Sequence, residues 1–215
     1  MFEDGWLVRG STAPDDVRRY YDELAATYDT TLASWGYRAP ERVAALTLEA
    51  LEPLDGGSGL AILDAGCGTG LAGQALRHAG FAGSLFGVDL SPSSVVLARE
   101  RGIYDEVVVG DLQRPLPHDA DRFDAVVCVG VLTYVPDVAG VCRELCRVVR
   151  PGGVVVLTQR DDVWRERNCG DVLHELERAA RWTVFHLSPP RSYLPGNADF
   201  GDTIGVRYLA ARVRV

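Results

Sequence analysis

The sequence predicts an α/β fold built on a single doubly wound, Rossmann-like sheet, and three observations support this class. Five short stretches in the middle of the chain are continuously apolar, which is typical of parallel strands covered on both faces. Most of them are separated by segments of helical length, as right-handed crossover connections require. A glycine-rich turn follows the first stretch. The five stretches are Leu60–Leu63, Leu85–Val88, Val107–Val109, Ala125–Val131 and Val154–Leu157.

Two helices are predicted before the first strand. The first runs from about Asp15 to Trp35, because apolar and aromatic residues recur there at helical spacing. The second begins at Pro40, a residue that suits the first turn of a helix, and ends before Pro53. A glycine-rich, linker-like stretch, Asp55–Gly59, then leads into the sheet.

The last quarter of the chain predicts a helix followed by an antiparallel strand pair that closes the sheet. The helix spans about Val163–Arg181, and the two β-rich segments are Trp182–Leu187 and Thr203–Val215. Residues 208–215 alternate in character, which indicates that one face of the last segment is less buried than the other. Between the third and fourth strands, residues 112–122 contain two prolines and are predicted to form a loop.

We expect one domain over residues 1–215, because no part of the chain requires a boundary. A single core of this size should bury roughly 70% of the surface that the unfolded chain exposes. Residues 1–55 would supply the N-terminal helices, residues 56–160 the ligand-binding core, and residues 161–215 the C-terminal helix and the closing strand pair.

The composition is that of an ordinary globular protein with an acidic balance. Apolar residues make up 47% of the 215, and the formal net charge is -8, so the basic surface that binds nucleic acid through its phosphates is not expected. All 22 basic residues are arginine, which excludes Schiff-base and Walker-type lysines. No apolar run approaches the roughly 20 residues of a membrane span. We therefore expect neither nucleic acid nor a membrane as a partner. For the oligomeric state, we expect a monomer or a homodimer.

The cysteines indicate a reducing compartment. Five are present, an odd number, and none forms a CxxC pair or has histidines at ligand spacing. A disulfide framework and a structural zinc site are both disfavoured by this pattern. We expect a cytoplasmic protein without a bound metal.

The segment Ile62–Gly70 is predicted to be a strand that runs into a glycine-rich turn and then a helix. Glycine permits positive φ angles and a close approach of the backbone to a ligand, and a helix N-terminus adds aligned N–H donors. Gly66, Gly68 and Gly70 have the spacing G-x-G-x-G, whereas a dinucleotide fingerprint has G-x-G-x-x-G. Asp64 at the strand end is a further departure from that fingerprint.

Two more carboxylates follow the next two strands. Asp89 ends the second strand, where it can accept hydrogen bonds from both hydroxyls of a ribose. Asp111 follows the third strand, where it can accept one from the exocyclic amine of adenine. Either residue alone could simply cap a helix. Because ligands of doubly wound sheets bind at the carboxyl ends of the strands, three acids at that edge favour a nucleoside site.

Together these segments resemble the class I S-adenosylmethionine-dependent methyltransferases over about residues 15–160. The start of the chain resembles the lid helices of small-molecule members, with particular similarity to the methyltransferase-like group of the Williams–Beuren region, which shares a Tyr-Asp pair and a Tyr-Arg-Ala-Pro run. The matching segments are Tyr20–Asp22, Tyr28–Asp29, Tyr37–Pro40, Ile62–Gly70, Val88–Ser91, Gly110–Leu112, Phe123–Val127 and Val148–Gly153.

The resemblance implies S-adenosylmethionine as cofactor, S-adenosylhomocysteine as its product, and a metabolite or natural product as the methyl acceptor. It implies that the glycine turn passes beneath the methionine part of the cofactor, that Asp89 holds the ribose, and that Asp111 reads the adenine edge. Val129 would line the sulfonium, and Arg38 would pair with the cofactor carboxylate. The full implied set is Tyr28, Arg38, Asp64, Gly66, Cys67, Gly68, Asp89, Leu90, Asp111, Leu112 and Val129.

The acceptor site would be built from the first helix and the loops after the fourth and fifth strands. Tyr21 and Tyr134 are the candidates for positioning the acceptor. Many small-molecule relatives carry a His pair where this chain has Thr133-Tyr134, so the most obvious imidazole base is missing. The residues expected around the acceptor are Tyr21, Trp35, Thr133, Tyr134, Arg160 and Trp164.

The first interpretation is a methyltransferase that acts on an O, N or C atom of a small molecule. Three alternatives stay open beside it. The same fold can host non-methylating chemistry on a retained sulfonium site, and the missing His pair keeps this alternative open. A non-catalytic protein that binds the cofactor is the second alternative. An NAD-binding module is the third, and the G-x-G-x-G spacing with Asp64 argues against it.

Overall fold

The computed structural model describes residues 10–52, 59–201 and 203–214, and within these residues eight strands form one sheet. Their order is β3-β2-β1-β4-β5-β8-β6, and the short β7 also pairs with β8. Most of the linker expected at Asp55–Gly59 lies outside the described residues. The strands are β1 (Ala61–Ala65), β2 (Ser84–Asp89), β3 (Glu106–Val109), β4 (Phe123–Cys128), β5 (Val149–Arg160), β6 (Trp182–Leu187), β7 (Arg191–Ser192) and β8 (Gly205–Val213).

The sheet is parallel except for β8, which confirms the predicted fold class. β1 pairs in parallel with both β2 and β4, so the chain order reverses beside β1, and the carboxyl ends of the strands meet at one edge there. β8 runs antiparallel between β5 and β6, which confirms the predicted antiparallel strand pair. The expectation that one face of this segment is less buried was wrong for most of the strand, because Tyr208 and Ala210 are buried, as are Leu209 and Ala211 on the other face.

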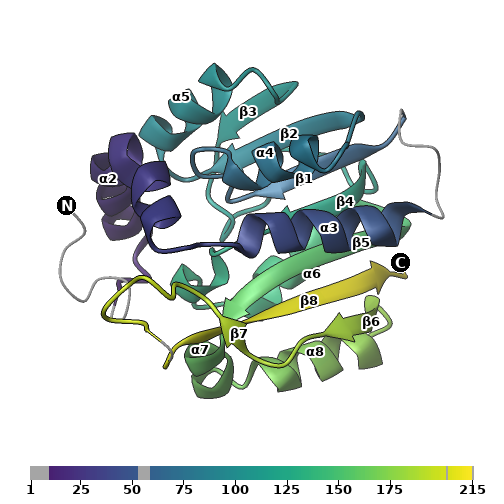
Figure 1. The fold of residues 1–215 in the computed structure, drawn as a ribbon. Coiled ribbons are helices and arrows are strands. Elements are labelled where there is room, and N and C mark those ends of the chain that lie inside the picture. Colours follow the sequence, from purple (N-terminus) through teal and green to yellow (C-terminus); the bar gives the residue numbers. More distant parts are fainter. Residues whose placement is uncertain (1–9, 53–58, 202, 215) are drawn as a thin grey trace.

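Helices cover both faces of the sheet (Figure 1). α3 and α4 pack with Ile62 and other inward side chains on one face, whereas α6 and α8 pack with Leu63 on the other. Successive residues of a strand point to opposite faces, which explains why β1 has to be apolar throughout. The helices are α2 (Pro14–Ser34), α3 (Ala39–Leu51), α4 (Leu71–His78), α5 (Pro92–Glu100), α6 (Val138–Val148), α7 (Asp161–Glu166) and α8 (Cys169–Arg178), with a 3-10 turn η2 (Leu132–Tyr134) after β4.

The two N-terminal helices begin and end within about a residue of their predicted limits. α2 lies beside the sheet rather than on either face, close to α5 (Figure 1). Gly36, with φ of +70°, ends this helix and lets the chain turn into α3. α2 is therefore placed where it can cover the carboxyl edge of the strands.

The prediction of one helix over Val163–Arg181 was wrong, because the segment forms two helices. Asn168 between α7 and α8 adopts the left-handed conformation, with φ of +49°, which interrupts the helical ladder. Arg167 fixes the break by donating to the carbonyl oxygens of Val135 at 2.6 Å and Thr133 at 3.0 Å.

The fourth strand also stops earlier than predicted, at Cys128, and the fifth is longer than its apolar run.

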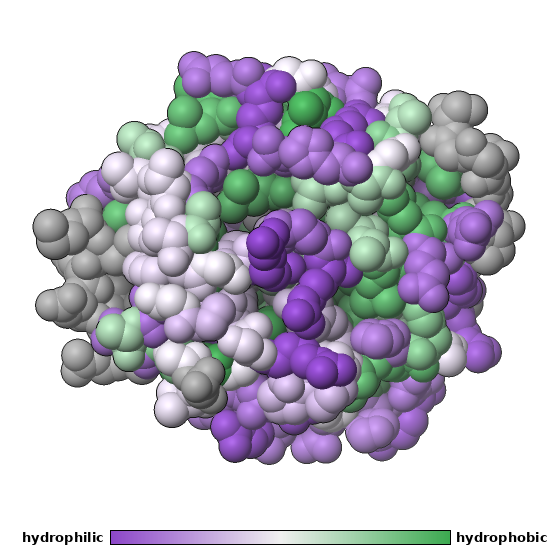
Figure 2. Space-filling view, viewed as in Figure 1, coloured by the Kyte–Doolittle hydropathy of each residue, from purple (hydrophilic) through white to green (hydrophobic). Residues whose placement is uncertain are grey.

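The surface mixes hydrophilic and hydrophobic residues on the face seen in Figure 2. In the described part of the chain, no helix has the length and apolarity needed to cross a membrane.

All five cysteines are buried as free thiols. The described residues contain no cluster of three or more His, Cys, Asp or Glu arranged to hold a metal ion.

Replacing Gly73 by alanine should destabilise the protein, although alanine is the better helix former. A Cβ at Gly73 would lie 2.2 Å from the Tyr104 hydroxyl, so the ring would have to move, and we expect a loss of about 1–3 kcal/mol of unfolding free energy. Gly170→Ala in α8 is the control, because its Cβ would meet no atom within 4 Å. That variant should gain up to about 1 kcal/mol. Urea denaturation measures both, and a stabilising Gly73→Ala would contradict the packing.

Candidate functional site

The glycine turn after β1 lies at the carboxyl edge of the sheet and is held by the end of β2. The Gly66 and Cys67 amides both donate to the Val88 carbonyl, at 2.8 and 3.0 Å, and the Gly68 amide donates to Asp89 Oδ2 at 2.7 Å. Gly66 has φ of +77°, and a Cβ there would lie 2.3 Å from a methyl group of Val131. A Cβ on Gly68 would instead point into open space. The turn thus presents bare backbone to a cavity.

This cavity, called here the outer pocket, has about 780 Å³ of empty space when the open solvent at its mouth is included. It lies between α2, the glycine turn and the ends of β2, β3 and β4. Its lining residues are Pro14, Val17, Arg18, Tyr21, Tyr28, Gly66, Gly68, Asp89, Leu90, Ser91, Ser94, Gly110, Asp111, Leu112, Gln113, Val129, Gly130, Val131, Tyr134 and Val135.

Asp89 has the most constrained carboxylate of the outer pocket. It accepts from the Gly68 amide and from the Ser91 amide at 2.9 Å, so its position is fixed from two sides. Burial raises the pKa of Asp89, whereas the hydrogen bonds from Ser91 and Gly68 lower it. A bound ligand with paired hydroxyl donors would add further hydrogen bonds to the same charged group.

Asp64 lies beneath the glycine turn and is fully buried. Its Oδ2 accepts from the Tyr104 hydroxyl at 2.7 Å and the Gly73 amide at 3.1 Å, while its Oδ1 has no hydrogen-bond partner among the described residues. Burial raises the pKa of Asp64 to about 7, against the two hydrogen bonds, which lower it. Asp64 therefore supports the turn from below and does not line the outer pocket.

Two carboxylates of α2 attach this helix to the core. Asp22 accepts from the Ser91 hydroxyl at 2.6 Å and from the Ser93 amide at 3.0 Å, at the N-terminus of α5. Asp29 accepts from the Thr69 hydroxyl at 2.5 Å and forms an ion pair with Arg101. The two Tyr-Asp pairs belong to the segments that resemble the family, and no role was predicted for their aspartates.

A second cavity adjoins the outer pocket and shares Tyr21, Tyr28, Gly130 and Tyr134 with it. We call it the tyrosine pocket. Its empty space is about 400 Å³ when open solvent is included. Its rings meet edge to face, with centroids 5.6 Å apart for Tyr21 and Tyr134 and 5.5 Å for Tyr37 and Tyr193. Its lining residues are Tyr21, Tyr28, Leu32, Tyr37, Gly130, Thr133, Tyr134, Arg160, Tyr193, Leu194 and Phe200.

The structure brings most of the predicted site residues together. Both acceptor candidates, Tyr21 and Tyr134, line the two cavities at their junction. Thr133 and Arg160 line the tyrosine pocket, as expected of residues around an acceptor. The predicted cofactor residues that line the outer pocket are Tyr28, Gly66, Gly68, Asp89, Leu90, Asp111, Leu112 and Val129.

Several predicted residues lie elsewhere. Arg38 pairs with Glu41 in the first turn of α3 at 3.2 Å, and its side chain is 73% exposed, so the expected contact with a cofactor carboxylate has no support in this arrangement. Cys67 turns into a small apolar cluster with Val95 and Val107. Trp35 and Trp164 line neither cavity.

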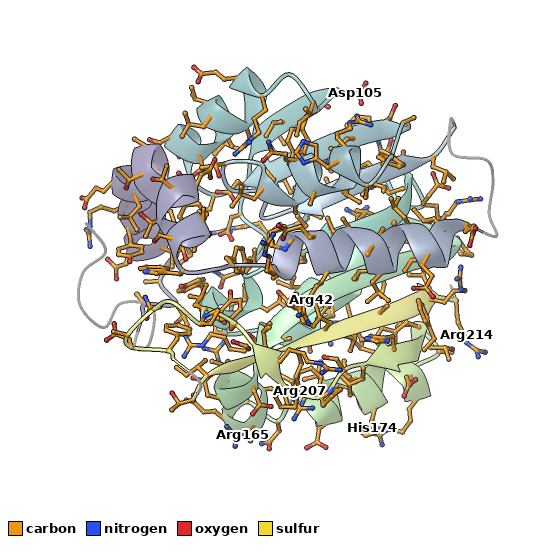
Figure 3. The ribbon with its side chains drawn as sticks, viewed as in Figure 1. Arg42, Asp105, Arg165, His174, Arg207 and Arg214 are labelled. Carbon is orange, nitrogen blue, oxygen red and sulfur yellow. The ribbon has the colours of Figure 1, made fainter. Side chains whose placement is uncertain are left out.

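His174 and His186, the two histidines in the part of the chain that could approach an acceptor, lie away from both cavities. His186 is on β6 and is exposed. His174 on α8 lies at the edge of the molecule and points away from α2 (Figure 3). Neither lines the outer pocket or the tyrosine pocket.

Sequence reasoning missed the contribution of residues 193–200. Tyr193 and Phe200 from this loop, and Tyr37 from the turn between α2 and α3, complete the wall of the tyrosine pocket. The loop is distant from α2 in the sequence, and its prolines indicated only irregular structure. The recurrence of aromatic residues in so long a loop was the available signal.

Comparison with known proteins agrees with this geometry. The family described as "Methyltransferase domain" matches residues 63–157. Methyltransferase-like protein 27 of Homo sapiens is 38% identical over 167 residues, which are 76% of this chain and 66% of that protein. A ubiquinone biosynthesis O-methyltransferase of Alkalilimnicola ehrlichii is 33% identical over 157 residues, 68% of this chain and 63% of that protein. The crystal structure of the cyclase SpnF is similar in fold, with a TM-score of 0.68 and 22% identity over 95% of this chain and 97% of that chain.

A glycine turn after the first strand, with acids at the ends of that strand and the next two, defines a Rossmann-like protein with a nucleoside-binding edge. These matches support a class I S-adenosylmethionine-dependent methyltransferase. The matched segments span a little under two thirds of the length of the two curated relatives.

The raised pKa of Asp64 predicts a pH-dependent stability. Between about pH 4 and 7 the folded protein holds a proton on Asp64 that the unfolded chain has lost, so the unfolding free energy should fall as pH rises and level off above 7. The decrease in unfolding free energy that Asp64 contributes is on the order of 3 kcal/mol. Asp64→Asn cannot titrate and should lack it, as urea denaturation from pH 4.5 to 8 would show.

Tyr104→Phe provides the matching variant for this test. It removes a hydrogen bond that lowers the pKa of Asp64, so the fall in stability should extend to higher pH. Parallel stability curves for the wild type and Asp64→Asn would contradict the assignment.

Proposed function

We propose that this protein transfers a methyl group from S-adenosylmethionine to an O, N or C atom of a small molecule. The observation that carries the proposal is the junction of two cavities at Tyr21 and Tyr134. One cavity has the backbone turn and carboxylates that a nucleoside cofactor needs, and the other has an aromatic wall suited to a compact organic acceptor. Both ligands would meet where the cavities join.

The outer pocket fits the cofactor on three observations. The open space above Gly68 can take a ligand against bare backbone. Asp89, Asp111 and Leu112 line this pocket; Asp89 would accept from the ribose hydroxyls, and Asp111 from the adenine amine with the Leu112 backbone beside it. Leu90 would pack on the base, and Val129 and Tyr28 would surround the methionine arm.

When bound, the cofactor supplies a methyl group on a good leaving group, so the protein has mainly to align the reactants and exclude water. Holding two reactants in a near-attack geometry can contribute on the order of 7–11 kcal/mol. α2 closes both cavities on one side through Tyr21 and Tyr28. Burial raises the pKa of Tyr21 and of Tyr134, so both hydroxyls stay protonated and act as hydrogen-bond donors that position the acceptor.

Two features bear on the acceptor and on the alternative chemistry. The relative from Alkalilimnicola ehrlichii is an O-methyltransferase of ubiquinone biosynthesis, which supports an oxygen acceptor in a biosynthetic reaction.

No His lines either cavity in the described part of the chain, and the structurally similar SpnF is a cyclase. A non-methylating reaction on the same cofactor is therefore the second candidate. The product mass separates them, since only methyl transfer adds one CH₂.

The first experiment is a thermal-shift comparison of S-adenosylmethionine, S-adenosylhomocysteine and NAD. A ligand at a hundred times its dissociation constant stabilises the folded state by about 2.7 kcal/mol. We expect a shift with both sulfur compounds and none with NAD. A shift with NAD alone would overturn the cofactor assignment, and binding without turnover on any acceptor would favour a cofactor-binding protein.

Asp89→Ala should weaken S-adenosylhomocysteine binding about 10- to 150-fold, because hydrogen bonds to charged groups contribute about 1.5–3 kcal/mol. Asp105→Ala is the matched control. Asp105 also holds a backbone amide, that of Leu85 at 2.7 Å, but lies on the side of the sheet away from α2 (Figure 3). Calorimetry should show near-normal affinity for the control, and equal losses in the two variants would remove the ribose role.

Tyr21→Phe should lower turnover about tenfold while S-adenosylhomocysteine affinity stays within about twofold, since the hydrogen bonds lost are those of the Tyr21 hydroxyl with the acceptor and with Tyr134. The ring contacts of Tyr21 with Tyr28 and Tyr134 would survive the change. Tyr20→Phe serves as control, because Tyr20 is its neighbour in the chain, is buried in the core and lines neither cavity. Equal rates for the Tyr21→Phe variant and the wild type would leave Tyr21 as a packing residue.

A further inference from the structure

The charge of the tyrosine pocket indicates which acceptors can bind there, given the proposed methyl transfer. Among the described residues that line this pocket, Arg160 is the one charged side chain, and no Asp, Glu, His or Cys faces it. The remaining wall consists of tyrosines, Phe200, leucines, Thr133 and the Gly130 backbone. Such a wall suits a planar, aromatic molecule, and its one ionic group is a cation.

Arg160 is held firmly at the end of β5. Its guanidinium donates from Nε to Asp162 Oδ1 at 3.1 Å and from Nη2 to Asp162 Oδ2 at 2.5 Å, and it stacks 5.0 Å from the centre of the Phe200 ring. The Arg160 side chain is 4% exposed, whereas that of Asp162 is 37% exposed. Asp162 does not line the tyrosine pocket, so the guanidinium is the side of this ion pair that the pocket presents, and water screens the exposed carboxylate more than the guanidinium.

The pocket also lacks a group that could remove a proton from the acceptor. Burial raises the pKa of Tyr21, Tyr134 and Tyr193, so these phenols stay neutral, although the nearby charge of Arg160 lowers the pKa of the last two. Thr133, which lines the pocket, and Gln159, to which its hydroxyl donates at 2.9 Å, are not bases. An acceptor that needed deprotonation in the pocket would find no partner among the described lining residues.

We propose that the acceptor is an aromatic acid that enters the tyrosine pocket as its anion, opposite the positive charge of Arg160. In the transfer an anionic oxygen bonds to the methyl carbon, the bond from that carbon to the sulfonium sulfur breaks, and the electron pair stays on sulfur. The negative charge of the acceptor and the positive charge of the donor cancel, so no proton has to leave. A protonated amine is disfavoured by the same guanidinium.

Three probes of one shape and different charge test this inference. They are 2-naphthoate, 2-naphthamide and 2-(aminomethyl)naphthalene, which are an anion, a neutral amide and a cation at pH 7. Calorimetry on the protein saturated with S-adenosylhomocysteine should give the naphthoate at least tenfold tighter binding than either of the others. Equal affinities, tighter binding of the amide or amine, or no binding of any of the three overturns the inference.

The variant Arg160→Gln should abolish the preference, with the naphthoate weakened at least tenfold and the amide changed less than threefold. Arg207→Gln is the matched control, since Arg207 also pairs with an Asp, Asp161 at 2.6 Å, but lies outside the tyrosine pocket beside α7 (Figure 3). It should keep the preference. If Arg160→Gln does not fold, Arg160→Lys, which retains the charge, should keep the order of the three affinities.

Cofactor binding is measured first and separates the two proposals. Wild-type protein that binds no S-adenosylhomocysteine would overturn the proposed function itself. Protein that binds it and yet shows no preference for the anion would overturn only the assignment of the acceptor.

Discussion

The attachment of α2 to the core is the constraint on which both cavities depend. A single carboxylate, Asp29, joins three parts of the chain, because it accepts from Thr69 in the glycine turn and pairs with Arg101 after α5. Arg101 also donates to the Thr69 carbonyl at 2.5 Å, so the turn is fixed by the same ion pair that holds the helix. Without this attachment, Tyr21 and Tyr28 would not stand over the strand ends, and neither cavity would have its outer wall.

The sequence of α2 achieves this with a simple repeat. Tyr21-Asp22 and Tyr28-Asp29 are seven residues apart, about two helical turns, so the two tyrosines share one stripe of the helix and the two aspartates share the next. One stripe faces the cavities and the other faces the hydroxyl and amide donors of the core. The polar stripe therefore sets the position of the aromatic one.

The features that could be predicted from the sequence are those governed by local pattern. Continuous apolar runs predicted parallel strands because both faces of the sheet are covered, and the glycine spacing with Asp89 and Asp111 located the edge of the sheet that forms the outer pocket. The break at Asn168 could not be predicted, because it depends on Arg167 capping carbonyl groups of a turn more than 30 residues earlier. Likewise, Tyr193 and Phe200 join the site only through tertiary contacts of a long loop. Arg38 was placed by analogy, and its neighbour Glu41 offers it a local partner instead.

The walls of the tyrosine pocket come from chain segments that are far apart in sequence. Tyr21 lies near the start of the chain, Tyr134 follows β4, and Tyr193 lies beyond β7, whereas the glycine turn and Asp89 are neighbours through adjacent strands. Contacts between distant segments form only after the loops between them have closed, so they lag behind local ones during folding. The same separation has an evolutionary consequence. Substitutions in residues 193–200 can reshape the wall of the tyrosine pocket while the glycine turn and Asp89, encoded elsewhere, stay unchanged.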